Sequence, residues 1–191
     1  VATYETAFGA VERPTHTNTS RDAMQHEVCG HRYADVSEAG YGVALLSDCK
    51  YGWTAREGRL MLSLLRAPKA PDPDCDMGRH TFRYALLPHV GHLRADASIV
   101  SRAAAFNNPP LRLAAAWGGE PAAAAAATAA AAPAWFAVQP AAASGDGESS
   151  LVLDTVKWAE DGDGAVLRLY EALGHRAAAL VRLPPSWRVA S

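Results

Sequence analysis

The stretch Ser37–Pro71, SEAGYGVALLSDCKYGWTAREGRLMLSLLRAPKAP, contains two apolar runs, Tyr41–Leu46 and Leu60–Leu65. Both runs are short, rich in Leu or Val and bounded by Gly or Pro, which favours buried β-strands over helices. The polar segment between them carries a carboxylate, an ammonium group and two aromatic rings, on Asp48, Lys50, Tyr51 and Trp53. Such groups at the end of a rigid strand are the chemistry of a sugar-binding surface, although most connections of this kind are only solvated loops.

Further strands are expected on both sides of this stretch. Glu27–Val36 has the composition of a strand, and Thr81–Pro88 alternates apolar and polar residues with the period of two that a strand requires. Asp96–Phe106 is the one helical candidate of the first half of the chain, and the following NNPP ends it. Val1–Asp22 is polar and contains Pro14, which predicts a long loop. Four or five strands closed by Gly or Pro predict a mostly β fold, an antiparallel β-sandwich.

The second half of the chain predicts a low-complexity segment followed by a small β-unit. Ala114–Ser150 is rich in Ala, Pro and Gly, which favours a mobile linker or insertion, although poly-Ala between Pro121 and Pro133 (residues 122–132) also permits a short helix. The turn Asp161–Gly164 predicts a hairpin. Its strands are expected at Leu151–Trp158, Ala165–Ala172 and Ala177–Leu183. The predicted divisions are therefore 1–113 (sandwich), 114–150 (linker) and 151–191 (small β-unit).

Composition excludes several classes of protein. The formal net charge of the 191 residues is −2, so no electrostatic argument favours nucleic acid or an anionic membrane as a partner. The sequence has no run of 18 apolar residues, and because it does not begin with Met we expect a piece of a longer protein. The three cysteines, at positions 29, 49 and 75, predict free thiols, with one disulfide and a leftover thiol as the alternative.

Three patterns have an ordinary structural interpretation that we prefer. The acidic segment Asp72–Gly78 departs from a calcium loop, and its Asp residues are expected to bond their own backbone. The sequon at Asn18 is interpreted as turn chemistry, in which Thr and Ser hydroxyls bond the backbone. Four histidines have no metal-ligand spacing and are interpreted as structural: His31, His80, His89 and His92.

Four segments resemble a known family: FGAVERPTHTNTSRDAMQHEVCGHRYADVSEAGYG, GYGVALLSDCKYG, LSLLRAPKAPDPDCDMGRHTFRYALLPHVG and SLVLDTVKWAEDGDGAVLRLYEALG. Together they resemble the C-terminal β-domain of the family 38 α-mannosidases, in the cytosolic or vacuolar-type branch. The chain departs from this family at Arg21, where a Trp usually follows NTS, and in the alanine-rich segment. The resemblance implies a mutarotase-like supersandwich and a retaining hydrolase of terminal α-D-mannosyl residues in oligosaccharides or N-glycans.

The resemblance also gives the candidate site a role. Asp48 and Lys50 are two residues apart, so on a strand they point to the same face, and the ordinary interpretation is a surface ion pair. In the family this acidic–basic pair reaches into the sugar site of the catalytic domain, and Tyr51 lies beside it. We therefore expect Asp48, Lys50 and Tyr51 to be substrate-binding residues.

The family's catalytic Asp residues and its zinc (or other divalent metal) lie in an N-terminal catalytic domain, and none of their motifs occurs in these residues. The expected partners are that catalytic domain and a mannose-containing oligosaccharide, with no nucleic acid or membrane, and these 191 residues alone are expected to be inactive. The family branch implies a cytoplasmic or vacuolar (lysosomal) location. The alternative function is a stand-alone carbohydrate-binding or interaction module.

Overall fold

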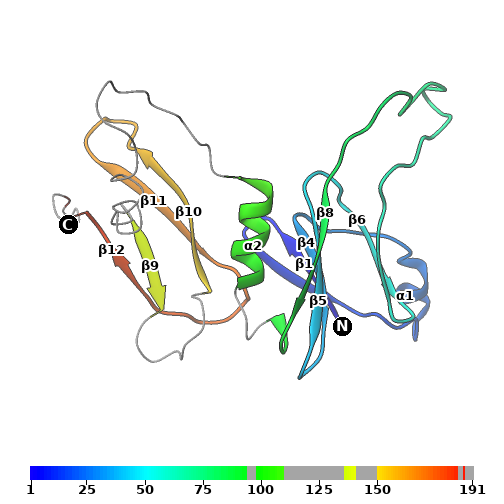
Figure 1. Cartoon of the computed structure of the whole chain (residues 1–191), viewed down its shortest axis with the longest axis horizontal. Coiled ribbons are helices and arrows are strands. Elements are labelled where there is room, and N and C mark those ends of the chain that lie inside the picture. Colours follow the sequence, from blue (N-terminus) through cyan, green and yellow to red (C-terminus); the bar gives the residue numbers. More distant parts are fainter. Residues whose placement is uncertain (94–97, 110–135, 141–149, 185–186, 188–191) are drawn as a thin grey trace, which may run out of the picture.

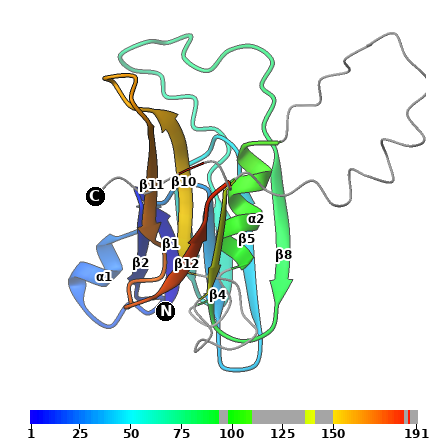
Figure 2. The same cartoon turned by 90° about the vertical axis from the view of Figure 1, so that its left-hand side faces the viewer.

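A computed structural model describes residues 1–93, 98–109, 136–140, 150–184 and 187. Its largest element is an antiparallel sheet with the strand order β2-β1-β4-β5-β8, which runs from left to right in Figure 2. The strands are β1 (Ala2–Thr6), β2 (Gly9–Arg13), β4 (Tyr33–Ser37), β5 (Gly42–Ser47) and β8 (Tyr84–His89). The predicted strands at Tyr41–Leu46 and Thr81–Pro88 are therefore confirmed as the neighbours β5 and β8.

The loop predicted for Val1–Asp22 is wrong over most of its length. β1 and β2 form a hairpin, and the short helix α1 (Ser20–Met24) follows. The polar composition concealed β1 because two of its buried residues, Thr3 and Glu5, are polar. The expected turn chemistry at the Asn18 sequon is confirmed, because the Thr19 hydroxyl oxygen caps α1 by accepting the backbone N–H of Asp22 at 3.1 Å.

A second, smaller sheet faces the first and makes the fold a sandwich, as predicted. Its order is β3-β6-β7, with β3 at Val28–Cys29, β6 at Gly52–Arg56 and β7 at Arg59–Leu62. The strand predicted at Glu27–Val36 is in fact two strands, β3 and β4, which belong to different sheets. Gly30 lies between them, where a Cβ would come within 2.9 Å of the Trp53 ring. The core between the two sheets contains Ala2, Tyr4, Ala34, Leu45, Trp53 and Ala55.

Two expectations for the opening stretch are wrong. Trp53 does not present an aromatic face to solvent, because it lies on β6 and is fully buried. The run Leu60–Leu65 is not a buried strand, since β7 ends at Leu62, exposure alternates along it, and Leu65 is 49% exposed. In the short hairpin β6–β7 only one face of each strand packs against the first sheet, and a continuous apolar run does not reveal this.

The other face of the first sheet packs on the helix α2 (Ser98–Asn107), which confirms the predicted helix. The hairpin of β10 (Leu151–Trp158) and β11 (Ala165–Glu171), with its predicted turn, lies beyond α2 (Figure 1). One core joins these layers, and its buried residues are Tyr33, Ala44, Leu46, Leu93, Ile99, Val100, Ala103, Ala172 and Leu173.

The last strands pair differently from the prediction. β12 (Ala179–Arg182), in the run expected to extend the β10–β11 hairpin, instead pairs with β9 (Ala137–Pro140). β9 belongs to the segment predicted to be a mobile linker or an insertion, and over these four residues the chain is a paired strand. The possible helix of residues 122–132 lies outside the described residues. No helix in the described part of the chain is long and apolar enough to span a membrane.

Candidate functional site

The three predicted site residues all lie on the short connection between β5 and β6, but they point to different surroundings. Asp48 is tied to Arg83 at the start of β8: its Oδ1 accepts the Arg83 backbone N–H at 3.0 Å, and its Oδ2 accepts Nε–H at 3.0 Å. These bonds, led by the one from the backbone, lower the pKa of Asp48 to about 2. The ion pair of Asp48 is therefore with Arg83 and not with Lys50, the partner that the sequence spacing suggests.

Lys50 lies beside a different group of residues. Its backbone N–H donates to the Ser47 hydroxyl oxygen at 2.9 Å, and its Nζ lies 5.3 Å from the centre of the Phe82 ring. It lines a groove of about 420 Å³ together with two carboxylates, those of Glu27 and Asp76. Lys50 thus lines an open, polar groove.

Tyr51 faces a second cleft on the other side of the connection. Tyr51 is 56% exposed, and its ring lies edge-on to that of His31, with the ring centres 6.0 Å apart. Its carbonyl oxygen accepts the backbone N–H of Gly30 at 3.0 Å, which fixes the end of the connection. Tyr51 and Lys50 are neighbours in sequence, yet they line separate hollows.

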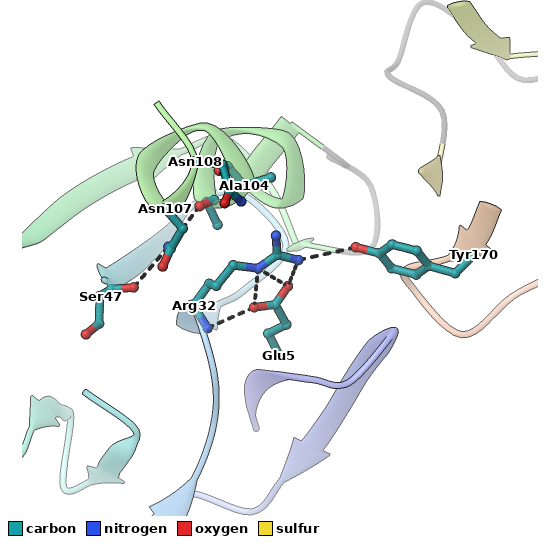
Figure 3. Close-up of polar contacts among 8 residues, drawn as sticks. Glu5, Arg32, Ser47, Ala104, Asn107, Asn108 and Tyr170 are labelled. Atoms are coloured by element: carbon teal, nitrogen blue, oxygen red, sulfur yellow. Dashed lines mark hydrogen bonds and ion pairs between the residues drawn. The ribbon is translucent and has the colours of Figure 1, made fainter. Parts of the chain in front are cut away.

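The cleft beside Tyr51 has a volume of about 580 Å³ and an ion pair at its base. Glu5 is almost fully buried, and its carboxylate accepts the Arg32 backbone N–H at 2.8 Å and Nε–H at 2.8 and 2.9 Å (Figure 3). Arg32 Nη2 also donates to Glu5 and, at 3.4 Å, to the hydroxyl of Tyr170 on β11. The hydrogen bonds to Glu5 raise the pKa of Arg32, so this guanidinium carries a permanent charge.

Aromatic rings and polar groups from several elements complete this cleft. Phe8, in the β1–β2 turn, packs edge-on against Tyr170 with ring centres 5.6 Å apart. Burial raises the pKa of Tyr170, so its hydroxyl stays protonated. Asn107 and Asp154 also line the cleft, from α2 and β10. Sequence analysis did not identify this group because Arg32 and Tyr170 are 138 residues apart and no local motif connects them.

The structural interpretations of the acidic segment and of two histidines are confirmed. Asp72 Oδ1 accepts the backbone N–H of Asp74 at 3.0 Å, so this acidic segment bonds its own backbone. His80 Nε2 lies 2.8 Å from the carbonyl oxygen of Asp76. His89 is buried, with its Nε2 at 2.7 Å from Asp35 Oδ1.

The predicted thiol state is also confirmed, because all three cysteines are free. Within the described residues, no group of three or more His, Cys, Asp or Glu side chains is arranged to hold a metal ion. The donor set of this part of the chain therefore does not fit a zinc site.

The antiparallel β fold is consistent with the family that the sequence resembles. Residues 1–74 match the family described as "Glycosyl hydrolases family 38 C-terminal domain". The resemblance found in the sequence is therefore confirmed.

Individual relatives extend this similarity beyond residue 74. The chain is 47% identical to Alpha-mannosidase 2C1 of Homo sapiens over 176 residues, which is 91% of this chain and 15% of the relative. It is 42% identical to Alpha-mannosidase G of Dictyostelium discoideum over 179 residues, which is 91% of this chain and 14% of the relative. It is 52% identical to an Alpha-mannosidase of Saccharomyces cerevisiae over 106 residues, 56% of this chain and 10% of the relative. The chain thus spans only a small part of the relatives it matches.

Proposed function

We propose that this chain is the C-terminal β-domain of an α-mannosidase that hydrolyses terminal α-D-mannosyl residues from oligosaccharides or N-glycans by a retaining mechanism. The observation that carries the proposal is the 42–47% identity to proteins named alpha-mannosidase over 91% of the chain. In this proposal the β-domain supports a catalytic domain outside these residues. A cytoplasmic location, which the resemblance to this branch implies, is part of the same proposal.

The proposed sugar contacts come from the connection between β5 and β6. Lys50 lines its groove, and its ammonium carries three N–H donors that match sugar hydroxyl groups. The exposed ring of Tyr51 offers an apolar face to a sugar ring at the second cleft. Both carboxylate oxygens of Asp48 already accept bonds from Arg83, so its contribution to sugar binding uses their remaining lone pairs.

The family's zinc, or another divalent metal, belongs to the catalytic domain in this proposal. Such a metal supplies a charge that binds and polarises sugar oxygens. The described residues of this chain do not provide its ligands, so their proposed role is to bind and orient the substrate.

Two assays test the proposal. The 191 residues alone are expected to give no turnover of an aryl α-mannoside with zinc added, whereas the full-length polypeptide hydrolyses it. In the full-length enzyme, Lys50→Ala is expected to lower kcat/KM about 10- to 150-fold, because a charged hydrogen bond contributes about 1.5–3 kcal/mol. Its melting temperature should change little, since the Lys50 Nζ lies over the partly exposed Phe82 ring.

Lys69→Ala is the matched control, because Lys69 is an exposed lysine of the connection between β7 and β8. If Lys50→Ala keeps the wild-type kcat/KM, Lys50 is not a residue of the sugar-binding site. Turnover by the 191 residues alone would contradict the assignment of catalysis to another domain. Binding of mannose oligosaccharides by a full-length polypeptide without hydrolysis would instead support a carbohydrate-binding module.

A further inference from the structure

The smaller sheet of the sandwich does not cover the whole of the larger one. The strand register places Tyr4, Ala34, Leu45 and Leu86 in one row across β1, β4, β5 and β8, all on the face toward the smaller sheet. Their exposed fractions are 2%, 0%, 8% and 70%, in the order of the row. The smaller sheet therefore covers the row as far as β5 and leaves the inner face of β8 open.

The open face is an apolar stripe rather than an isolated side chain. Tyr84 and Leu86 alternate along β8 on this face and are 58% and 70% exposed. On the neighbouring strands the same face continues with Val43 and with Val36, which is 37% exposed. A groove of about 350 Å³ between the β6–β7 hairpin and the larger sheet is lined by Val36, Val43 and Leu86, together with Leu45 and Leu60.

The edge of the smaller sheet beside this groove is β7, which pairs only with β6 in the described part of the chain. Arg56 and Arg59 close the two-residue turn of this hairpin, so Arg59 and Met61 direct their backbone N–H and C=O groups to β6. The bond from Ser63 N–H to the Gly52 carbonyl, at 2.9 Å, continues that alternation. The N–H and C=O groups of Leu60 and Leu62 therefore point outward, over the groove.

An exposed row of apolar side chains next to an open strand edge fits one kind of partner, an additional β-strand. A strand paired with Leu60 and Leu62 would extend the smaller sheet from three strands to four. Its inward side chains would then cover Leu86 and Tyr84. The groove is also lined by Arg59, exposed at the start of β7, which favours an acidic residue on the incoming strand.

We propose that the edge of β7 binds an extended segment of the same polypeptide from outside residues 1–191, with apolar residues at alternate positions and an acidic residue opposite Arg59. This proposal rests on the proposed function, in which the chain is one domain of a longer enzyme. The relatives supply the argument for its source, because the region matched by the chain is only 14–15% of the length of the first two. A second copy of the chain and an unrelated peptide are the other occupants that the test distinguishes.

Hydrogen–deuterium exchange with single-residue resolution tests the proposal. The Leu60 and Leu62 amides are expected to exchange rapidly in the 191-residue chain and at least about 100-fold more slowly in the full-length enzyme. The Met61 amide is the internal control, because it faces β6 and is protected in both proteins. Equally rapid exchange of Leu60 and Leu62 in both proteins would overturn the proposal, as would protection that requires dimerisation of the 191-residue chain.

A substitution gives an independent measurement. Leu86→Asp is expected to leave the melting temperature of the 191-residue chain unchanged and to lower that of the full-length enzyme by several degrees. Met24→Asp, at a residue that is 77% exposed on α1, should change neither. If Leu86→Asp leaves the melting temperature of the full-length enzyme unchanged, the proposal is overturned. Because mannosidase activity is measured separately, an active full-length enzyme with an unprotected β7 edge would refute the strand and leave the proposed function intact.

Discussion

Replacing Asp48 with Asn tests whether this residue is primarily a structural anchor of the β5–β6 connection. Asn retains an oxygen for the Arg83 backbone N–H, but it puts an amide nitrogen where Oδ2 now accepts Nε–H at 3.0 Å. Two donors then face each other, and the negative charge is lost. We therefore expect Asp48→Asn to reduce the stability of the folded chain without removing a core side chain.

The size of the expected loss of stability follows from the lowered pKa of Asp48. A change from 3.8 to about 2 corresponds to about 2.4 kcal/mol at about 1.36 kcal/mol for each pKa unit. Arg83 is 55% exposed, so solvent and salt screen this interaction and we expect about 1 kcal/mol. For a chain of this length, that energy lowers the melting temperature by about 2–4 °C.

The pH dependence has a definite sign. The folded-state pKa of Asp48 is lower than its ordinary value, so the stabilisation is present above about pH 4 and is lost as the pH falls through about 2. The wild-type chain and Asp48→Asn should therefore differ at pH 7 and converge near pH 2. Asp163→Asn, in the exposed turn between β10 and β11, is the control that should follow the wild type throughout.

Thermal unfolding followed by circular dichroism between pH 2 and 7 measures both effects. Equal melting temperatures at pH 7 would show that the bonds to Arg83 do not stabilise the fold. A difference that persists at pH 2 would show that the carboxylate charge is not its source. Either result would refute the assignment of Asp48 as an anchor.

Two further substitutions test the packing. Trp53→Ala should lower the free energy of unfolding by about 3–5 kcal/mol, because the side chain is fully buried between the sheets, whereas Met24→Ala, at a 77% exposed residue, should stay within about 0.5 kcal/mol. Urea denaturation of the three proteins measures this contrast, and a loss of less than about 1 kcal/mol at Trp53 would contradict the described core. Gly42→Ala should cost about 1–3 kcal/mol, because the new Cβ would overlap the buried His89 ring. Gly9→Ala, with open space around its Cβ, is the control, and equal stability of the two alanine variants would show that the His89 ring moves aside.

The sequence predicted the parts of the fold that have a local signal. β8 and β10 were anticipated because apolar residues alternate along them, and β5 because a short apolar run is bounded by Gly. The hairpin turn at Asp161–Gly164 was anticipated from its Asp and Gly residues, and the end of α2 from NNPP. The sequence did not predict β1. Glu5 is buried in this strand because Arg32 neutralises its charge, and Arg32 is 27 residues away in the sequence. The sequence also did not predict β9, because an alanine-rich neighbourhood conceals a pairing with β12.

The sequence predicted which connection carries the candidate site residues, but not the surroundings of each side chain. Asp48, Lys50 and Tyr51 do lie together on the segment between β5 and β6, as the sequence indicated. The different surroundings of the three side chains were not predictable from the sequence. They depend on Arg83 and His31, the partners that the tertiary fold brings to Asp48 and Tyr51. Asp48 and Lys50 would share one face only if the strand continued through them, whereas β5 ends at Ser47.

The anchoring of this connection has a consequence for the proposed sugar contacts. Asp48 is fixed to β8, the Lys50 backbone is fixed to Ser47, and the Tyr51 carbonyl oxygen accepts from Gly30. The backbone that presents the Lys50 ammonium and the Tyr51 ring is therefore held before any ligand arrives, which lowers the entropy lost on binding. Because the two side chains face different hollows, each one can be altered without displacing the other. Substitutions at Lys50 and Tyr51 should consequently have independent, additive effects on the binding of a sugar chain that contacts both.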